Sequence, residues 1–367
     1  YFGITAIGTN TTTFCLRNII TNNILNGQAY YGLYHFYQNF TKVNGNTIDN
    51  MLSANTNAYA MRFENVDNFE INKNKINRFG QYGMYFNGAN HQGGSGTNRS
   101  QIINNMIGGI AYNANPYGVY FQIGGAPSTF RYVDFWHNTI HLNNAGGNTG
   151  SIFFFQNFSA STSIVSLDFR NNTFTANGNT TTYFYAYNGG YGAPFTSFLN
   201  NNIYSISNPG GSSVTMNTTS SSGNSWISAS FGGVNTISCK GLDPVFLNTS
   251  TNLHTLSTPL SNVGINTTVT SDIDGDVRPL APSGTVDIGA DEFNIPAENI
   301  GVFAVLNPAL PLTPGLQNVV VQIKNYGTAT ITSANVRYKV GVNGSIYTFP
   351  WTGTITTGST ANVTFTG

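Results

Sequence analysis

The sequence predicts an all-β chain in which a long repetitive solenoid precedes a smaller all-β module. Three observations carry this prediction. A short motif recurs between residues 19 and 203, the segments between its copies alternate apolar and polar residues, and no stretch shows helical spacing. Two alternating segments after residue 318, beyond the repeats, indicate the second module.

The composition excludes several classes of protein. Charged residues make up 8% of the 367 residues, against about 25% in a typical soluble domain, and the net charge is zero. Disorder requires low hydrophobicity with high net charge, and coiled coils are rich in charged helix formers, so neither class fits. No basic stripe is present, which argues against nucleic-acid binding. No apolar run of about 18 residues occurs, so no membrane span is expected.

The recurring motif is an apolar residue, two variable residues, an asparagine, one variable residue and an apolar residue. Asparagine tolerates the left-handed conformation at a sharp bend, and its amide can bond the amide of the next coil. We therefore expect one asparagine per coil, with the flanking apolar residues filling the interior. The motif asparagines, 24 to 34 residues apart, are Asn22, Asn46, Asn74, Asn105, Asn138, Asn172 and Asn201.

A second motif lies between these copies. Its clearest copies read Tyr-Gly-x-Tyr and begin at Tyr31, Tyr82 and Tyr117. Each period thus holds at least two short strands separated by Gly and Asn turns. A period that drifts with loop length is typical of a solenoid, whereas propeller blades need about 40 to 45 residues each.

The region after the repeats carries a family resemblance. The stretches 241–246, 252–254 and 261–264 precede an acidic closing segment at 272–279 and 286–293. Together with the repeats, they resemble a right-handed parallel β-helix of the pectin-lyase-like superfamily, in the form found in secreted Bacteroidota proteins. The resemblance implies a β-helix over residues 1–293, with a terminal module from about 242. It also implies type IX secretion to the outer face of a Gram-negative bacterium.

The sequence pattern changes from Ile295 onward, after the repeated asparagine motif has ended. Residues 318–327 and 334–340 read as alternating strands, and three prolines precede them. Residues 294–367 resemble an immunoglobulin-like β-sandwich of the adhesion-related kind, incomplete at Gly367, which implies a spacer or anchor. We expect the chain to be joined to further domains of a longer protein.

The best acid–base candidates are two aspartates in neighbouring coils. Asp134 and Asp168 each lie four residues before a motif asparagine, which predicts that they stack about 4.8 Å apart. Such carboxylates share a proton or bind a cation, and His137 and Arg170 are near in sequence. The alternative is a solvated pair beside Arg170. The same spacing places Lys42 beside Glu70 as a surface ion pair.

An aromatic ladder is the second candidate site. Strand alternation predicts that one residue per coil points outward to form a platform for sugar rings or another surface. The alternative is ordinary aromatic packing between strands. The ladder contains Arg62 and the predicted contact residues Tyr34, Tyr85, Tyr120, Phe153 and Tyr185.

The acidic closing segment is the third candidate. Asp272, Asp274 and Asp276 alternate around Gly275 and resemble a calcium loop, although the spacing departs from an EF-hand. A Ca²⁺ ion is the cofactor that this segment would hold. The alternative is a turn whose carboxylates accept backbone N–H bonds and pair with Arg278.

These features favour a non-catalytic adhesin or structural protein of the cell surface, in contact with a polysaccharide or cell-surface glycan. The rival hypothesis is a polysaccharide lyase or glycoside hydrolase that uses Asp134 and Asp168. A third hypothesis is a scaffold or filament subunit, since fold alone does not decide function.

Overall fold

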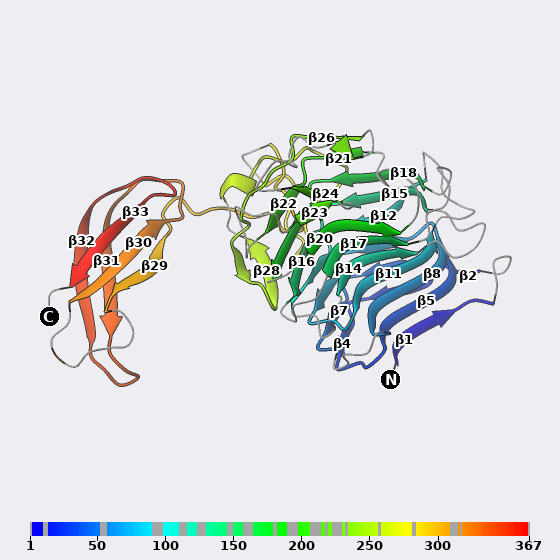
Figure 1. Ribbon diagram of the computed structural model, residues 1–367, viewed down its shortest axis with the longest axis horizontal. Helices are drawn as coiled ribbons and strands as arrows, with labels where there is room; N and C mark the ends of the chain where they lie inside the picture. The colour runs from blue at the N-terminus through cyan, green and yellow to red at the C-terminus, as the bar shows by residue number, and fades with distance from the viewer. Residues whose placement is uncertain are drawn as a thin grey trace. The chain divides into compact units, whose positions relative to one another are not determined.

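The computed structural model divides the chain into two compact units, Tyr1–Phe293 and Asn294–Gly367, both built almost wholly of strands (Figure 1). Among the described residues, no helix has the length and apolar character needed to span a membrane. The structure describes residues 2–9, 14–51, 57–89, 98–109, 116–122, 130–144, 150–156, 164–178, 182–188, 197–205, 214–216, 219–221, 230–231, 234–255, 258–280, 284–308, 315 and 318–365.

The first unit is a parallel β-helix, in which successive coils add strands to three parallel ladders. The first ladder contains the strands with the Tyr-Gly-x-Tyr motif. It consists of β1 (Phe2–Ile7), β5 (Tyr31–Asn39), β8 (Tyr59–Asp67), β11 (Tyr82–Ala89), β14 (Tyr117–Gln122), β17 (Gly150–Gln156), β20 (Thr182–Asn188) and β23 (Val214–Met216).

The other two ladders flank the motif asparagines. The second consists of β3 (Ile19–Thr21), β6 (Lys42–Asn44), β9 (Glu70–Asn72), β12 (Ser100–Ile103), β15 (Phe130–Trp136), β18 (Ile164–Arg170), β21 (Ser197–Leu199) and β26 (Val234–Ile237). The third consists of β4 (Ile24–Asn26), β7 (Thr47–Asp49), β10 (Lys75–Asn77), β13 (Met106–Gly108), β16 (Thr139–Asn144), β19 (Thr173–Gly178) and β22 (Asn202–Ser205). Three short strands join the edges, namely β2 (Cys15–Leu16), β24 (Thr219–Ser221) and β25 (Ser230–Phe231).

A continuous asparagine ladder runs between the second and third ladders. Asn105 shows the pattern: its Nδ2 donates to Asn138 Oδ1 at 2.9 Å, and its Oδ1 accepts the Nδ2 of Asn74 at 2.9 Å. The first member is Asn23, which bonds Asn46, so the prediction of Asn22 for this coil is wrong by one residue. Buried amides bonded on both sides stabilise the stack, because none is left unsatisfied.

The bend itself is made by the residue before each ladder asparagine. These residues have φ between 50° and 69°, which is the left-handed region. The sequence predicts that one asparagine makes both the bend and the bond to the next coil, but in the structure two neighbouring residues divide these roles. They are Asn22, Gly45, Lys73, Asn104, His137, Asn171 and Asn200.

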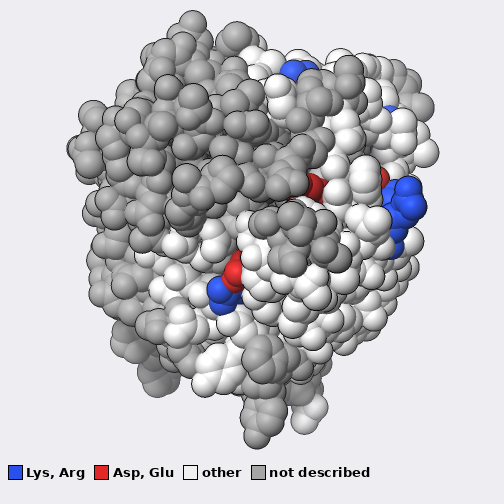
Figure 2. Space-filling model, turned by 90° about the vertical axis from the view of Figure 1, so that its right-hand side faces the viewer, with Lys and Arg blue, Asp and Glu red and all other residues white. Residues whose placement is uncertain are grey.

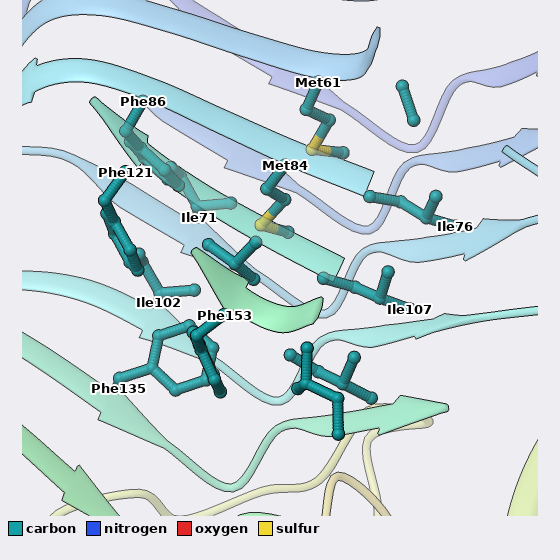
Figure 3. Close-up of a cluster of buried hydrophobic side chains, with 14 of the residues drawn as sticks. Met61, Ile71, Ile76, Met84, Phe86, Ile102, Ile107, Phe121, Phe135 and Phe153 are labelled. Atoms are coloured by element: carbon teal, nitrogen blue, oxygen red, sulfur yellow. The ribbon is translucent and has the colours of Figure 1, made fainter. Parts of the chain in front are cut away.

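The interior of the coils is filled by stacked apolar side chains. Phe86 and Phe121 stack with ring centroids 5.4 Å apart, and the buried cluster continues through Phe135 and Phe153 (Figure 3). The prediction that Phe153 faces outward is therefore wrong. Its cross-strand partner is the buried Val119, and a shift of one residue moves a side chain to the other face of a strand.

The closing segment runs back along the bends of the coils. It contains β27 (Phe246–Asn248), β28 (Asn252–Thr255) and the 3₁₀ turn η2 (Thr258–Leu260). Asn200 donates to Val263 O at 2.9 Å, Asn171 to Ile265 O at 2.7 Å and Asn104 to Ser271 O at 2.6 Å. The left-handed bend residues thus hold the closing segment against the β-helix.

The second unit contains two small antiparallel sheets, as in a β-sandwich. One sheet is formed by β29 (Ile300–Asn307), β30 (Val319–Asn325) and β33 (Thr360–Phe365), and the other by β31 (Ile331–Lys339) and β32 (Ile346–Ile355). Buried residues of both sheets, including Ile323, Val336 and Val363, form one core.

Candidate functional site

The outer side of the first ladder carries two rows of aromatic side chains, which we call the tyrosine face. Cross-strand pairing aligns the rows along four coils, and Arg62 takes the place of a ring in the second. Row one is Tyr31, Tyr59, Tyr82 and Tyr117, and row two is Tyr34, Arg62, Tyr85 and Tyr120.

The rings within a row stack on one another. Tyr59 and Tyr82 have centroids 4.5 Å apart and an interplanar angle of 7°, and Tyr82 and Tyr117 continue the row at 5.3 Å. Between rows, Tyr82 meets Tyr120 edge to face at 5.1 Å. Both geometries are the favoured ones for aromatic pairs, so the face is a rigid surface.

Arg62 lies in the second of the four coils of this face, between Tyr34 and Tyr85. Its guanidinium carbon lies 4.7 Å from the ring centroid of Tyr59 and 5.2 Å from that of Tyr85. Its Nη1 donates to Tyr31 Oη at 2.8 Å, and it forms an ion pair with Glu64. The cation is therefore held by both π faces and a carboxylate.

The face is partly open and partly covered. Tyr31, Tyr34, Tyr82 and Tyr117 are partly exposed, whereas Tyr85 and Tyr120 are buried, at 5% and 7% exposure. The prediction that Tyr85 and Tyr120 form an exposed platform is therefore wrong, although they lie on the predicted side. The side chain of Tyr185 lies outside the described residues, and its backbone pairs with that of Phe153.

The row that begins with Tyr31 was not predicted, and the glycine of the motif explains why. Strict alternation places Tyr31 and Tyr34 on opposite sides of a strand. At Gly83, a Cβ atom would come within 2.6 Å of Ile107 Cγ2 in the interior. The glycine therefore takes an inward position without a side chain, and both tyrosines of the motif lie on the outer face.

Asp134 and Asp168 are direct cross-strand partners in β15 and β18, as the repeat predicts. Each carboxylate is buried and has its own arginine: Arg99 Nε lies 2.5 Å from Asp134 Oδ1, and Arg170 Nη2 lies 2.6 Å from Asp168 Oδ2. Burial raises the pKa of Asp134, and the bonded Arg99 opposes that rise. The geometry is thus neither the shared proton nor the solvated pair expected from the sequence, but two neutralised ion pairs.

The other two residues of the predicted acid–base group are engaged elsewhere. His137 is fully buried at a bend, with Nε2 3.2 Å from Thr267 Oγ1 and 3.1 Å from Asn171 Nδ2. Burial lowers the pKa of His137 well below its ordinary value, so the ring is neutral. Arg170 lies over the ring of Trp136 at 5.2 Å. Neither residue completes a proton-transfer pair with Asp134 among the described contacts.

The acidic closing segment forms a turn around one aspartate. Asp272 Oδ1 accepts the backbone N–H groups of Asp274, Gly275 and Asp276 at 2.8–2.9 Å, and Oδ2 accepts that of Glu292 at 3.0 Å. Asp274 pairs with Lys75, and Asp276 is exposed. Within the described part of the chain, Asp272, Asp274 and Asp276 do not bring three ligand atoms into metal-binding range.

Arg278, which the sequence places beside these aspartates, pairs instead with Glu292. Arg278 Nη1 lies 2.8 Å from Glu292 Oε2, and both side chains are completely buried. Backbone carbonyls of Asp287 and Gly289 accept further bonds from this guanidinium. The pair joins two stretches of the closing segment, because a buried charge is stable only when it is paired and hydrogen-bonded.

Comparison with known proteins gives no relative: no family model, no curated protein and no solved structure matches the chain.

Proposed function

We propose that the chain is a non-catalytic β-helix of a secreted or cell-surface protein, acting as an adhesin or structural component that contacts neutral glycans. The observation that carries the proposal is the tyrosine face. Flat aromatic rings stack on the apolar faces of sugar rings. The partly exposed members of the face are Tyr31 and Tyr34 in the first of the four coils and Tyr82 and Tyr117 in the third and fourth, with the buried Tyr59 in the second.

The charge distribution supports a neutral glycan. Few charged side chains lie among the described residues on the side of the molecule that Figure 2 shows, and the chain has no net charge. Arg62 is neutralised by Glu64 within the tyrosine face. The hydroxyls of the partly exposed tyrosines can bond sugar hydroxyls without attracting a polyanion. Burial raises the pKa of Tyr34 to about 12, which keeps its hydroxyl a donor at ordinary pH.

The carboxylates support a role without catalysis. An acid–base pair must reach its substrate and hold a proton that it can transfer. Asp134 and Asp168 are buried, and each is bonded to an arginine. A lyase or hydrolase remains the second candidate, because the two aspartates do stand side by side in adjacent coils. Catalysis would require both ion pairs to open.

The finer assignments follow from the sequence resemblance. We propose that the first unit is related to pectin-lyase-like β-helices of Bacteroidota that reach the outer surface by type IX secretion. The second unit would be an immunoglobulin-like spacer, which is supported by its two antiparallel sheets around one core.

Affinity electrophoresis in gels containing neutral polysaccharides tests the binding proposal with the full chain. We expect retardation of the wild-type chain in at least one gel and its loss in Tyr34→Ala and Tyr82→Ala. The control is Tyr347→Ala, since Tyr347 is an exposed tyrosine of the second unit. Equal retardation of all variants, or none for the wild type across neutral glycans, would contradict the proposal.

A further inference from the structure

A group of three side chains in the closing segment is not used by the proposed function. His254 lies on β28, and Asp274 and Asp291 lie on two later stretches of the segment. One ligand atom from each residue lies within 4.8 Å of the other two, and His254 Nε2 is 2.5 Å from Asp274 Oδ2. Asp291 is buried and Asp274 is exposed, so the group joins the interior to the surface.

Asn252 fixes the orientation of the His254 ring on the side away from the two aspartates. Asn252 Oδ1 accepts the backbone N–H of His254 at 3.1 Å, which fixes the orientation of that amide. The same oxygen contacts His254 Nδ1. Because a carbonyl oxygen only accepts, Nδ1 carries a ring proton, and in the singly protonated ring Nε2 presents a lone pair to the carboxylates. Metal-binding histidines are held in this way by an acceptor on the second ring nitrogen.

A nitrogen lone pair and a carboxylate oxygen that face each other repel, unless a positive charge lies between the two atoms. Either a second proton on the ring or a cation can supply it. Lys75 Nζ neutralises the other oxygen of Asp274 at 2.8 Å. Asp291 has no ion pair with a lysine or arginine of the described chain, and its nearest bond is a 3.4 Å contact from Thr255 N. A buried carboxylate in this position gains from a bound cation.

We propose that His254, Asp274 and Asp291 bind one divalent transition-metal ion of the zinc class. One imidazole nitrogen and two carboxylate oxygens form a ligand set typical of zinc, whereas calcium takes six to eight oxygens. Ligands about 2.0–2.1 Å from one ion lie at most about 4.2 Å apart, so a ligand atom that lies beyond this distance, within the 4.8 Å limit of the group, would have to move inward on binding. Asp274 is free to do so because it is exposed.

The ion would act as a clasp within the closing segment. It joins β28 to the turn around Asp272 and to the stretch before Phe293. Asp274 is also paired with Lys75 of β10, so the clasp extends to a coil of the β-helix. A ligand that binds only the folded chain stabilises it by mass action, so zinc should raise the unfolding midpoint.

Titration calorimetry and thermal unfolding of the metal-stripped full chain with ZnCl₂ test the proposal. We expect one saturable site, a higher unfolding midpoint with zinc, and binding at least about tenfold weaker in His254→Ala and Asp291→Asn. The control is Asp276→Asn, an exposed carboxylate of the same segment outside the group, which should bind as the wild type does. Absence of saturable binding by the wild type, or unchanged affinity in His254→Ala, would overturn the proposal.

A spectroscopic measurement covers the case in which a variant does not fold. X-ray absorption at the zinc edge of the wild-type chain should show nitrogen and oxygen ligands at about 2.0–2.1 Å. A sulfur ligand at about 2.3 Å would instead place the ion at a cysteine, Cys15 or Cys239, and would contradict the site. Calcium that binds more tightly than zinc would also contradict it.

Discussion

The guanidinium of Arg99 is bonded to the buried carboxylate of Asp134, with Nε 2.5 Å from Oδ1. The same arginine reaches the neighbouring strand, where Nη1 donates to Ser166 Oγ at 2.6 Å and Nη2 to Ser166 O at 2.9 Å. One side chain thus neutralises a carboxylate and connects its own coil to the next two. Asp134, one of the two aspartates that the sequence suggests as catalytic, therefore stabilises the fold through its bond to Arg99.

Removal of Arg99 should leave a buried charge without its partner. We expect Arg99→Ala to lower the free energy of unfolding by about 3 kcal/mol at pH 7. The loss should shrink at low pH, because Asp134 can then be neutral, and the Arg99→Ala/Asp134→Asn double variant should recover part of it. Denaturant unfolding measures these values.

The matched control is Lys42→Ala. Lys42 and Glu70 form the equivalent cross-coil pair of the second ladder at 2.9 Å, but Lys42 is exposed and Glu70 is partly exposed. An exposed pair contributes about 0–1 kcal/mol, so its loss should be small. Equal effects of the two substitutions would show that burial does not distinguish the pairs.

The asparagine ladder should be a major source of stability. Asn105→Ala removes buried bonds to Asn74, Asn138 and Ile71 O, and leaves their polar atoms unsatisfied. We expect a loss of about 3 kcal/mol in the free energy of unfolding. The comparison is Asn266→Ala, since Asn266 is exposed and donates to Gly284 O, and it should lose less than about 1 kcal/mol. A small effect at Asn105 would contradict the role given to the ladder.

Much of the second ladder could be predicted from the spacing of the asparagines. The register of Lys42, Glu70, Asp134 and Asp168 follows from it, because a fixed residue in each coil aligns its neighbours. The ladder asparagine of the first coil could not be predicted, since Asn22 and Asn23 are both asparagines and the motif fits either. The bond of Arg99 to Asp134 could not be predicted either, because Arg99 lies just before its strand and is not part of the repeated motif.

The first ladder was predicted less well because its motif varies. Residues 150–153 are a weak copy of the motif, in which the sequence places Gly150 at the position of Tyr117 and Phe153 at that of Tyr120. In the structure Tyr117 pairs with Ser151 instead, and this shift of one residue turns Phe153 into the interior. His254 and Asp291 are 37 residues apart and belong to no repeat, so only the path of the closing segment brings them together. Local periodicity predicts contacts between coils, and it carries no information on a segment that folds back across them.

Buried histidines should make the protein sensitive to acid. Burial lowers the pKa of His35 and of His141 to about 4, against about 6.5 in the unfolded chain. The unfolded chain therefore takes up protons first, and stability should fall as the pH drops from about 6.5 towards 4. Each histidine contributes up to about 3 kcal/mol to this fall.

The variant that checks this dependence is His141→Gln, compared with the wild type in denaturant unfolding between pH 4 and pH 7. Burial raises the pKa of Asp287 to about 7, which gives the opposite dependence, but this contribution is common to both proteins and cancels. The difference in stability between wild type and variant should move in favour of the variant as the pH falls. A constant difference would contradict the assignment of His141 as neutral.

The central claim is that this β-helix binds glycans without cleaving them. The most direct measurement incubates the purified full chain with the polysaccharides that retard it, and records new reducing ends and unsaturated sugar products. We predict that the chain binds the polysaccharides without releasing product, and that the wild type and Asp134→Asn give the same background of reducing ends and unsaturated sugars. Product that forms with the wild type and disappears in Asp134→Asn would contradict the account and establish the second candidate.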